Sequence, residues 1–261
     1  MKLQLKNFVA VMAMAIAFTS CSSDDDTTIT GEGNLKLEFD NVYGSADFAI
    51  GTNYTNSNGE VLNVSRIKYI ISNVVLIKAD GSTYTVPKNE SYFIVDELTS
   101  SSTLINLANV PAADYKAIKF GIGVDKEQWE LGADGQGDFL AIAQNAQMMW
   151  SWSAGYKFLN FEGTFTSATV ADATEYKVHT GQTGTDYNYA EVTLNFEEGD
   201  VAQVRTTVTP QIHIMTDLQH ITDGTNKINL SEQATVMGGS KLALVTNNIT
   251  NMFEVHHVHN D

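Results

Sequence analysis

The chain has 261 residues, of which 43% are hydrophobic and 10% aromatic, a composition typical of a globular protein. Its 15 Lys and Arg against 31 Asp and Glu give a formal net charge of −16, which repels polyanions and excludes nucleic-acid binding. The single cysteine, Cys21, excludes a disulfide framework, so the hydrophobic core alone must stabilise the fold.

The N-terminal segment has the pattern of a bacterial lipoprotein signal peptide, predicted over residues 1–20. Lys2 and Lys6 form its short positive region, and residues 8–18 are apolar, a run too short to span a bilayer comfortably. Cys21 stands where a lipoprotein signal peptidase would cut, and we expect it to receive the lipid. The alternative is an ordinary secretory peptide followed by an incidental cysteine, which would leave an unexplained free thiol.

A flexible acidic tether is predicted next, over residues 21–33, because Ser, Thr, Asp and Gly dominate it. The acidic run at residues 24–26 resembles the export signal that sends some lipoproteins to the outer face of a Gram-negative outer membrane. We therefore expect an outer-membrane lipoprotein exposed at the cell surface, with the periplasmic face as the alternative. Without residues 1–20 the chain keeps 13 basic and 31 acidic residues, a formal net charge of −18.

Residues 34–261 are predicted to form a single domain, in which alternation of apolar and polar residues indicates β-strands. In chain order these strands cover residues 35–39, 67–77, 84–86, 92–95, 115–124, 190–196, 204–214 and 252–259. Residues 139–149 lack the alternation and are predicted to form a helix. This spacing favours an all-β fold, an antiparallel β-sandwich, immunoglobulin-like or jelly-roll-like, with one short inserted helix.

Two of the three tryptophans lie close together in residues 148–156. On an extended backbone Trp150 and Trp152 point to the same face. Paired tryptophans most often fill a core. They can also line a carbohydrate site or a redox site, since tryptophan is the most readily oxidised aromatic residue.

The C-terminal strand contains three of the six histidines. If the strand is regular, His257 and His259 share one face and His256 lies on the other. Two imidazoles at this spacing can converge on one copper or zinc ion. The opposing interpretation is a frayed chain end without a metal.

The remaining histidines are less informative from their pattern alone. His179 comes at the end of a predicted strand before a Gly-rich turn, where a lone histidine is usually a polar turn residue. His213 and His220 are expected to face solvent. The sequence holds no G-x-S-x-G segment, P-loop, dinucleotide-binding glycine pattern or C-x-x-C-H haem motif, so we expect a binding protein rather than an enzyme.

Several segments together resemble the copper-binding MbnP-like family, whose best-known members are associated with methanobactin. The most specific is the M-x-W-x-W-x-x-G-Y pattern at residues 148–156. The others occur in family order at residues 67–74, 121–125, 162–163 and 179–181. The resemblance extends over roughly residues 34–259.

The resemblance implies an extracytoplasmic β-sandwich that binds copper, as Cu(I) or Cu(II), without turnover. In related copper proteins the ion lies between histidines and a kynurenine made from a tryptophan by a di-haem enzyme of the peroxidase type. Carried onto this chain, Trp150 or Trp152 becomes the candidate for oxidation and His179 a candidate ligand. His257 and His259 join the metal candidates through their spacing.

Two functions follow from these observations. The first is a lipid-anchored copper-binding protein that exchanges the metal with an outer-membrane transporter. The second is a metal-free surface module for glycan or protein that uses Trp150 and Trp152 as a stacking platform. Solvent exposure of the indole faces and the distance to a histidine discriminate between them.

Overall fold

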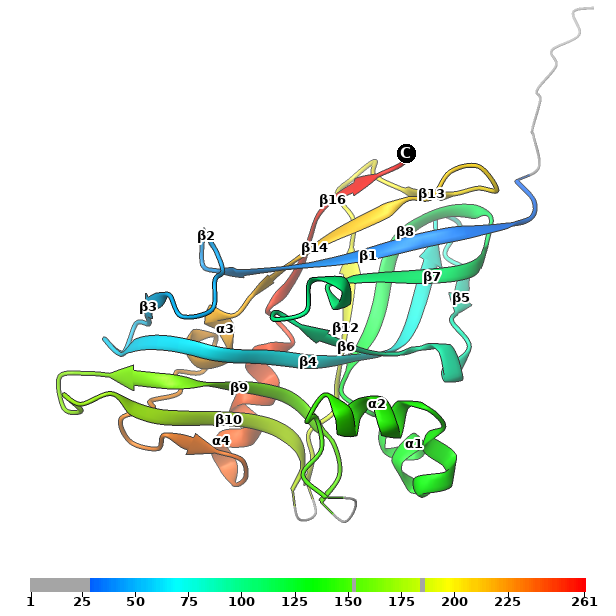
Figure 1. Ribbon diagram of the computed structural model, residues 1–261. Helices are drawn as coiled ribbons and strands as arrows, with labels where there is room; N and C mark the ends of the chain where they lie inside the picture. The colour runs from blue at the N-terminus through cyan, green and yellow to red at the C-terminus, as the bar shows by residue number, and fades with distance from the viewer. Residues whose placement is uncertain (1–28, 152–153, 184–185) are drawn as a thin grey trace, which may run out of the picture.

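The protein is described here by a computed structural model that covers residues 29–151, 154–183 and 186–261 (Figure 1). The predicted signal peptide, Cys21 and residues 21–28 of the predicted tether lie outside the described residues, as does Trp152. From residue 32 onward the described chain forms two β-sheets with a shared hydrophobic core. The predicted all-β sandwich is therefore confirmed.

The smaller sheet contains the first and the last described strands. It consists of β1 (Glu32–Tyr43), β2 (Ala46–Asp47), β7 (Leu104–Pro111), β14 (Gln211–Asp217) and β16 (Phe253–His259). The order is β16-β14-β1-β2, and β7 also pairs with β1. β1 and β14 run parallel, whereas the other pairs in this sheet are antiparallel.

The larger sheet is built around one long strand, β4 (Val61–Lys78), and its main path runs β11-β10-β9-β4-β8-β12. The bounds on this path are β8 (Ala113–Ile122), β9 (Lys157–Thr166), β10 (Thr174–Thr183), β11 (Asp186–Tyr187) and β12 (Ala190–Asn195). Five short strands join it at the side: β3 (Asn53–Thr55), β5 (Thr83–Thr85), β6 (Tyr92–Asp96), β13 (Ala202–Val204) and β15 (Thr235–Val236).

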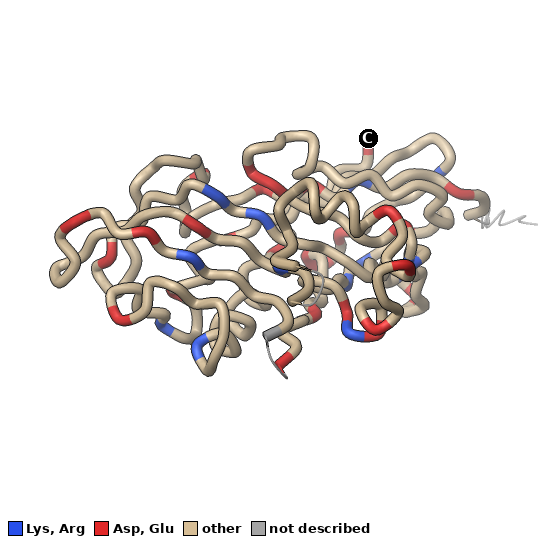
Figure 2. The backbone as a smooth tube through the Cα atoms, turned by 60° about the horizontal axis from the view of Figure 1, so that its bottom comes forward, with Lys and Arg blue, Asp and Glu red and all other residues tan. Residues whose placement is uncertain are grey.

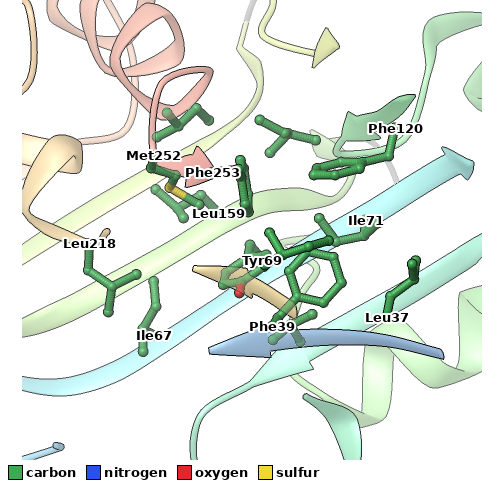
Figure 3. Close-up of a cluster of buried hydrophobic side chains, with 14 of the residues drawn as sticks. Leu37, Phe39, Ile67, Tyr69, Ile71, Phe120, Leu159, Leu218, Met252 and Phe253 are labelled. Carbon is green, nitrogen blue, oxygen red and sulfur yellow. The ribbon is translucent and has the colours of Figure 1, made fainter. Parts of the chain in front are cut away.

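Apolar side chains from facing strands fill the space between the sheets (Figure 3). Phe39 of β1 meets Tyr69 of β4 and Phe120 of β8 edge-on, with ring centroids 6.1 and 5.8 Å apart. Phe253 of β16 completes the cluster, 5.8 Å from Tyr69. The buried Tyr69 hydroxyl donates to Asn41 at 3.1 Å, so the polar atom in this cluster is satisfied.

β4 changes its partner in the middle, between Tyr69 and Ile71, and a β-bulge follows between Ser72 and Val75. Its first half pairs with β9 and its second half with β8. Asn73 lies in the bulge with a left-handed backbone (φ 51°), which asparagine tolerates better than most residues. Its side-chain amide donates to Asp125 Oδ2 at 2.9 Å and so ties the bulge to the segment that follows β8.

Asp125 caps the helix Lys126–Glu130 (α1) and collects hydrogen bonds from several elements. Its carboxylate accepts from the Gln128 backbone N–H at 2.9 Å and from the Tyr92 hydroxyl at 2.8 Å. Burial by itself would raise the pKa of Asp125, but these hydrogen bonds and the one from Asn73 lower it to about 2. The ionised carboxylate therefore anchors the start of the helical insertion to the sheet.

The insertion between β8 and β9 covers the outer face of the larger sheet through a second, smaller core. Ile70 of β4 packs there with Phe139 and Ala143 of α2 (Phe139–Asn145) and with Phe158. The predicted helix at residues 139–149 is confirmed but shorter, because Gln147 has φ 61°, a conformation that an α-helix does not accommodate.

Further helices were not predicted. They are α1, α3 (Gln219–Asp223), α4 (Ser240–Ile249) and the 3₁₀ turns Lys88–Glu90, Ser100–Ser102 and Ala133–Gln136. Within the part of the chain that the structure describes, no helix is both long and apolar enough to cross a bilayer.

The strand predicted at residues 204–214 is wrong, because two strands of different sheets share this range. β13 pairs with β8, whereas β14 starts at Gln211 and pairs with β1. Pro210 stands directly before β14 and has no N–H to give to a strand ladder. The prediction also lacks β7, β9 and the short strands β2, β3, β11 and β15.

Replacing Gly123 by alanine tests how rigidly the insertion is held. Gly123 has φ 108°, and a Cβ there would lie 2.3 Å from the Phe158 ring. Gly123→Ala should lower the free energy of unfolding by ~3 kcal/mol, through backbone strain and overpacking together. Gly81→Ala, at φ 88° with open space around it, isolates the backbone contribution and should cost about 1 kcal/mol. Equal losses in urea unfolding would contradict a tightly packed Phe158.

Candidate metal centre

The register of β9 and β10 brings His179 to a polar position on the outer face of the larger sheet. In this antiparallel ladder His179 lies opposite Asn160, and Lys177 lies opposite Glu162. Val178, the neighbour of His179, faces the core. His179 is nevertheless only 3% exposed. The outer face of the sheet is therefore covered at this point.

A carboxylate holds one nitrogen of the His179 imidazole. Nε2 lies 2.7 Å from Glu162 Oε1, a distance at which Nε2–H donates to the carboxylate. In that tautomer Nδ1 keeps its lone pair. Nδ1 is buried and has no hydrogen-bond partner among the described residues. Metal-binding histidines are commonly held in this way, with a carboxylate behind the ring and a free lone pair in front.

Asn160 adds unpaired polar atoms on the opposite strand. Its side chain is fully buried, and neither its amide nitrogen nor its amide oxygen has a hydrogen-bond partner within the described part of the chain. An unpaired buried polar group costs about 1–3 kcal/mol. Since residues directly opposite have Cβ atoms about 4.5–5.5 Å apart, Asn160 and His179 can reach one small ligand together.

Trp150 lies beside this pair. The segment after α2 folds back on β9, with a bridge between Met149 and Tyr156 and a hydrogen bond from Trp150 N to Gly155 O at 3.2 Å. The ring centroids of Trp150 and His179 are 6.2 Å apart, with the planes at 48°. We call the group formed by His179, Asn160, Glu162 and Trp150 the His179 centre.

Gly181 allows the indole to come this close. A Cβ at Gly181 would lie 2.8 Å from the Trp150 ring and 2.4 Å from the Tyr156 carbonyl oxygen. β10 continues past Gly181 to Thr183. The interpretation of His179 as a polar turn residue is therefore wrong, because the glycine that follows it accommodates the tryptophan ring within a strand.

Burial favours the neutral form of the His179 imidazole. Burial lowers the pKa of His179, and Lys157 and Lys177 lower it further, although the hydrogen bond to Glu162 acts in the other direction. Arg66 Nη1 lies 3.4 Å from the same carboxylate. Figure 2 brings this face forward and shows basic residues interspersed with acidic ones. A neutral imidazole presents a lone pair to a metal at neutral pH.

Met148 and Trp152 are the nearest other members of the M-x-W-x-W pattern around Trp150. Met148 is fully buried in the second core with Phe139 and Tyr156, so it packs rather than faces the centre. Trp152 lies outside the described residues.

His257 and His259 form the predicted pair, with Nε2 atoms 2.7 Å apart, but at a different place. They lie on β16 in the smaller sheet, near the C-terminus at the top of Figure 1, whereas β10 lies at the bottom in the larger sheet. The structure therefore separates these two histidines from His179 and Trp150.

A β-bulge changes the direction of His256. His213 pairs with His257 and Ile214 with Val255, which leaves His256 as the extra residue. The prediction that His256 faces away is wrong, because its Nδ1 lies 2.7 Å from His257 Nδ1.

His213 and His220 differ in exposure. The side chain of His213 is only 16% exposed and lies against His257, so the prediction that it faces solvent is wrong. The side chain of His220 on α3 is 37% exposed but its Nδ1 is buried, so it faces solvent only in part.

The comparison with known families decides the relationship. The MbnP family model matches residues 32–238, most of the sequence. The chain belongs to the MbnP family. The match includes Trp150, Glu162 and His179, whereas the resemblance had been expected to reach residue 259. The β16 histidines lie beyond the MbnP match.

Two further comparisons stand beside this match. The solved structure of MbnP from Methylosinus trichosporium aligns at 13% identity with a TM-score of 0.48, covering 79% of this chain and 81% of that chain. No curated protein matches the sequence.

Two residues of the His179 centre were missed as site residues. Glu162 was noted only as part of a family pattern, and Asn160 was not singled out. Both become visible once β9 and β10 are paired, because the ladder places Asn160 opposite His179 and Glu162 two residues further along. Asn160 and Glu162 are polar residues two positions apart, and this alternation in the sequence indicates that they share one face of a strand.

Replacing Asn160 by leucine tests whether its amide is unpaired in the metal-free protein. Asn160→Leu should raise the free energy of unfolding by about 1–3 kcal/mol, because it removes a buried polar group that has no hydrogen-bond partner among the described residues. Asn41→Leu is the matched control, since the Asn41 side chain is buried but bonded to Glu97 and Tyr69, and it should destabilise. Destabilisation by both substitutions in urea unfolding would contradict an unpaired Asn160.

Proposed function

We propose that this MbnP-family chain is a lipid-anchored, extracytoplasmic copper-binding protein whose metal binds at the His179 centre. The observation that carries the proposal is the buried His179 Nδ1, which has no hydrogen-bond partner among the described residues while Glu162 holds the other nitrogen. Imidazole nitrogen suits copper. The copper binding that the family resemblance implies supports the choice of metal.

The proposal includes a kynurenine ligand made from Trp150, with Trp152 as the alternative. An unmodified indole cannot supply a nitrogen ligand, because the lone pair of its nitrogen belongs to the ring. Kynurenine has an aryl amine whose lone pair is available. The 6.2 Å between the Trp150 and His179 ring centroids supports Trp150, since groups from both side chains could reach one ion.

The modification requires an external oxidant, and we propose a di-haem enzyme of the peroxidase type acting with hydrogen peroxide. Two molecules of hydrogen peroxide supply the two oxygen atoms that cleave the indole C2–C3 bond, which gives N-formylkynurenine and two molecules of water. Hydrolysis then releases formate and frees the aryl amine. Trp150 is half-buried, so part of its ring is accessible to such a partner.

The proposed location is the outer membrane, through lipid on Cys21 and with the domain facing the cell exterior. A formal net charge of −18 on the chain without residues 1–20 favours accumulation of cations. The proposed partner in that place is an outer-membrane transporter that receives or delivers copper. Turnover of a substrate is not part of the proposal.

The alternative function, a metal-free stacking platform for glycan or protein, has less support. Such a platform needs an open aromatic face. Trp150 is only partly exposed, and it packs against His179 and the backbone of Gly181. This environment favours a ligand held between the two rings.

Replacing His179 tests the copper proposal directly. His179→Gln should weaken copper binding at least tenfold, because it removes the imidazole Nδ1. The measurement is competition with a Cu(I) chelator of known affinity, on protein purified from its native host. His220→Gln removes an imidazole from α3 and should keep the parental affinity. Unchanged affinity in the His179 variant would remove this residue from the site.

The tryptophan modification is tested on the same native protein, by the mass of the peptide holding residues 148–156 and by copper content. In the parent protein we expect kynurenine at position 150 and copper bound. In His179→Gln we expect one equivalent of copper less. Unmodified tryptophan with copper still bound would contradict the kynurenine ligand only. Unmodified tryptophan without copper would contradict the proposed function.

A further inference from the structure

Four histidines meet on one side of the β14–β16 pair, and we call them the β16 histidine cluster: His213, His256, His257 and His259. His257 is at its middle. The ring centroids of the other three lie 4.4 to 4.8 Å from that of His257. The close packing of four imidazoles on one another calls for a separate explanation.

The β-bulge creates the cluster. In a regular strand His256 and His257 would point to opposite faces. Because the ladder skips His256, its ring turns to the side of His257, where His213 arrives from the neighbouring strand. Bulges often redirect a side chain in this manner at functional sites.

The nitrogen atoms of three of these histidines lie close enough together to reach one metal ion. His257 Nδ1 lies 2.7 Å from His256 Nδ1 and 3.4 Å from His213 Nδ1. One nitrogen from each of the three residues lies within 4.8 Å of the others. A tetrahedral ion with bonds of about 2.0–2.1 Å holds its nitrogen ligands roughly 3.3 Å apart. A small rotation of the exposed His256 ring would therefore complete a three-histidine site.

In His213 and His257 the ring nitrogen Nε2 has a hydrogen-bond partner, which leaves Nδ1 for the metal. His213 Nε2 lies 3.2 Å from Asp40 Oδ2, and His257 Nε2 lies 2.7 Å from His259 Nε2. If each Nε2–H donates to that partner, both Nδ1 atoms keep their lone pairs and face the same point. His259 then orients His257 rather than binding the metal itself.

We propose that Nδ1 of His213, His256 and His257 bind one divalent transition-metal ion, Zn(II) or Cu(II), at a site separate from the His179 centre. Three neutral imidazoles with an open fourth position suit these borderline cations. The β16 residues of this site lie beyond the range matched by the family model. The proposal does not depend on copper at the His179 centre.

Zinc titration of the metal-free full chain tests the proposal, with a chromophoric zinc chelator as competitor. The parent protein should bind one zinc ion at this site. Its zinc affinity should fall at least tenfold in His256→Gln and in His257→Gln. Asp40→Ala, which removes the acceptor of His213 Nε2–H, should weaken zinc binding about tenfold. His220→Gln is the control for a lost imidazole outside the cluster and should bind zinc as the parent does.

Cu(II) added to the same proteins gives an independent readout, because the electron paramagnetic resonance spectrum reports nitrogen ligands. The imidazole signature should be reduced in His257→Gln and retained in His220→Gln. Parental zinc affinity in both β16 variants would overturn the proposal. Loss of zinc only in His179→Gln would also overturn it and would assign the ion to the first centre. Zinc binding that is lost in His259→Gln but kept in His256→Gln would contradict the assignment of Nδ1 atoms.

Discussion

The pairing register of β9 and β10 is the constraint on which the His179 centre depends. It sets His179 opposite Asn160 and brings Glu162 to the imidazole Nε2. A slip of one residue would turn every side chain of the strand to the other face, so His179 would enter the sandwich core. The apolar side chains of Phe161 on β9 and Val178 on β10 oppose this slip, because they are buried in the core between the sheets. Packing of the core thus fixes the direction of the buried His179 imidazole.

A second set of interactions brings the tryptophan to that imidazole. Asn73 in the bulge of β4 and Asp125 at the start of α1 are joined by a hydrogen bond, and both belong to segments that carry the family resemblance. Neither touches His179. They anchor the helical insertion, whose end returns along β9 and presents Trp150. The segments that carry the family resemblance thus contain two groups of residues. Asn73 and Asp125 anchor the insertion, whereas Trp150 and His179 can bind a ligand.

Apolar alternation predicted most of the sandwich, because one face of nearly every strand is buried. It failed where the ladder is irregular or the chain changes sheets. The bulge at His256 reverses the expected face, and Pro210 separates two strands that the pattern joined. Trp150 and His179 were found through the family resemblance. Asn160 and Glu162 depend on contacts across a hairpin, which no local pattern contains. Unpaired polar atoms appear only once burial is known.

The most direct test of the central claim is X-ray diffraction at the copper absorption edge, from crystals of protein isolated from its native host. Anomalous difference density locates copper without reference to any activity. The account predicts a peak within bonding distance of His179 Nδ1, about 2.0–2.1 Å, on the side of the ring away from Glu162 and next to residue 150. Copper found elsewhere, with no density at His179 Nδ1, would contradict it.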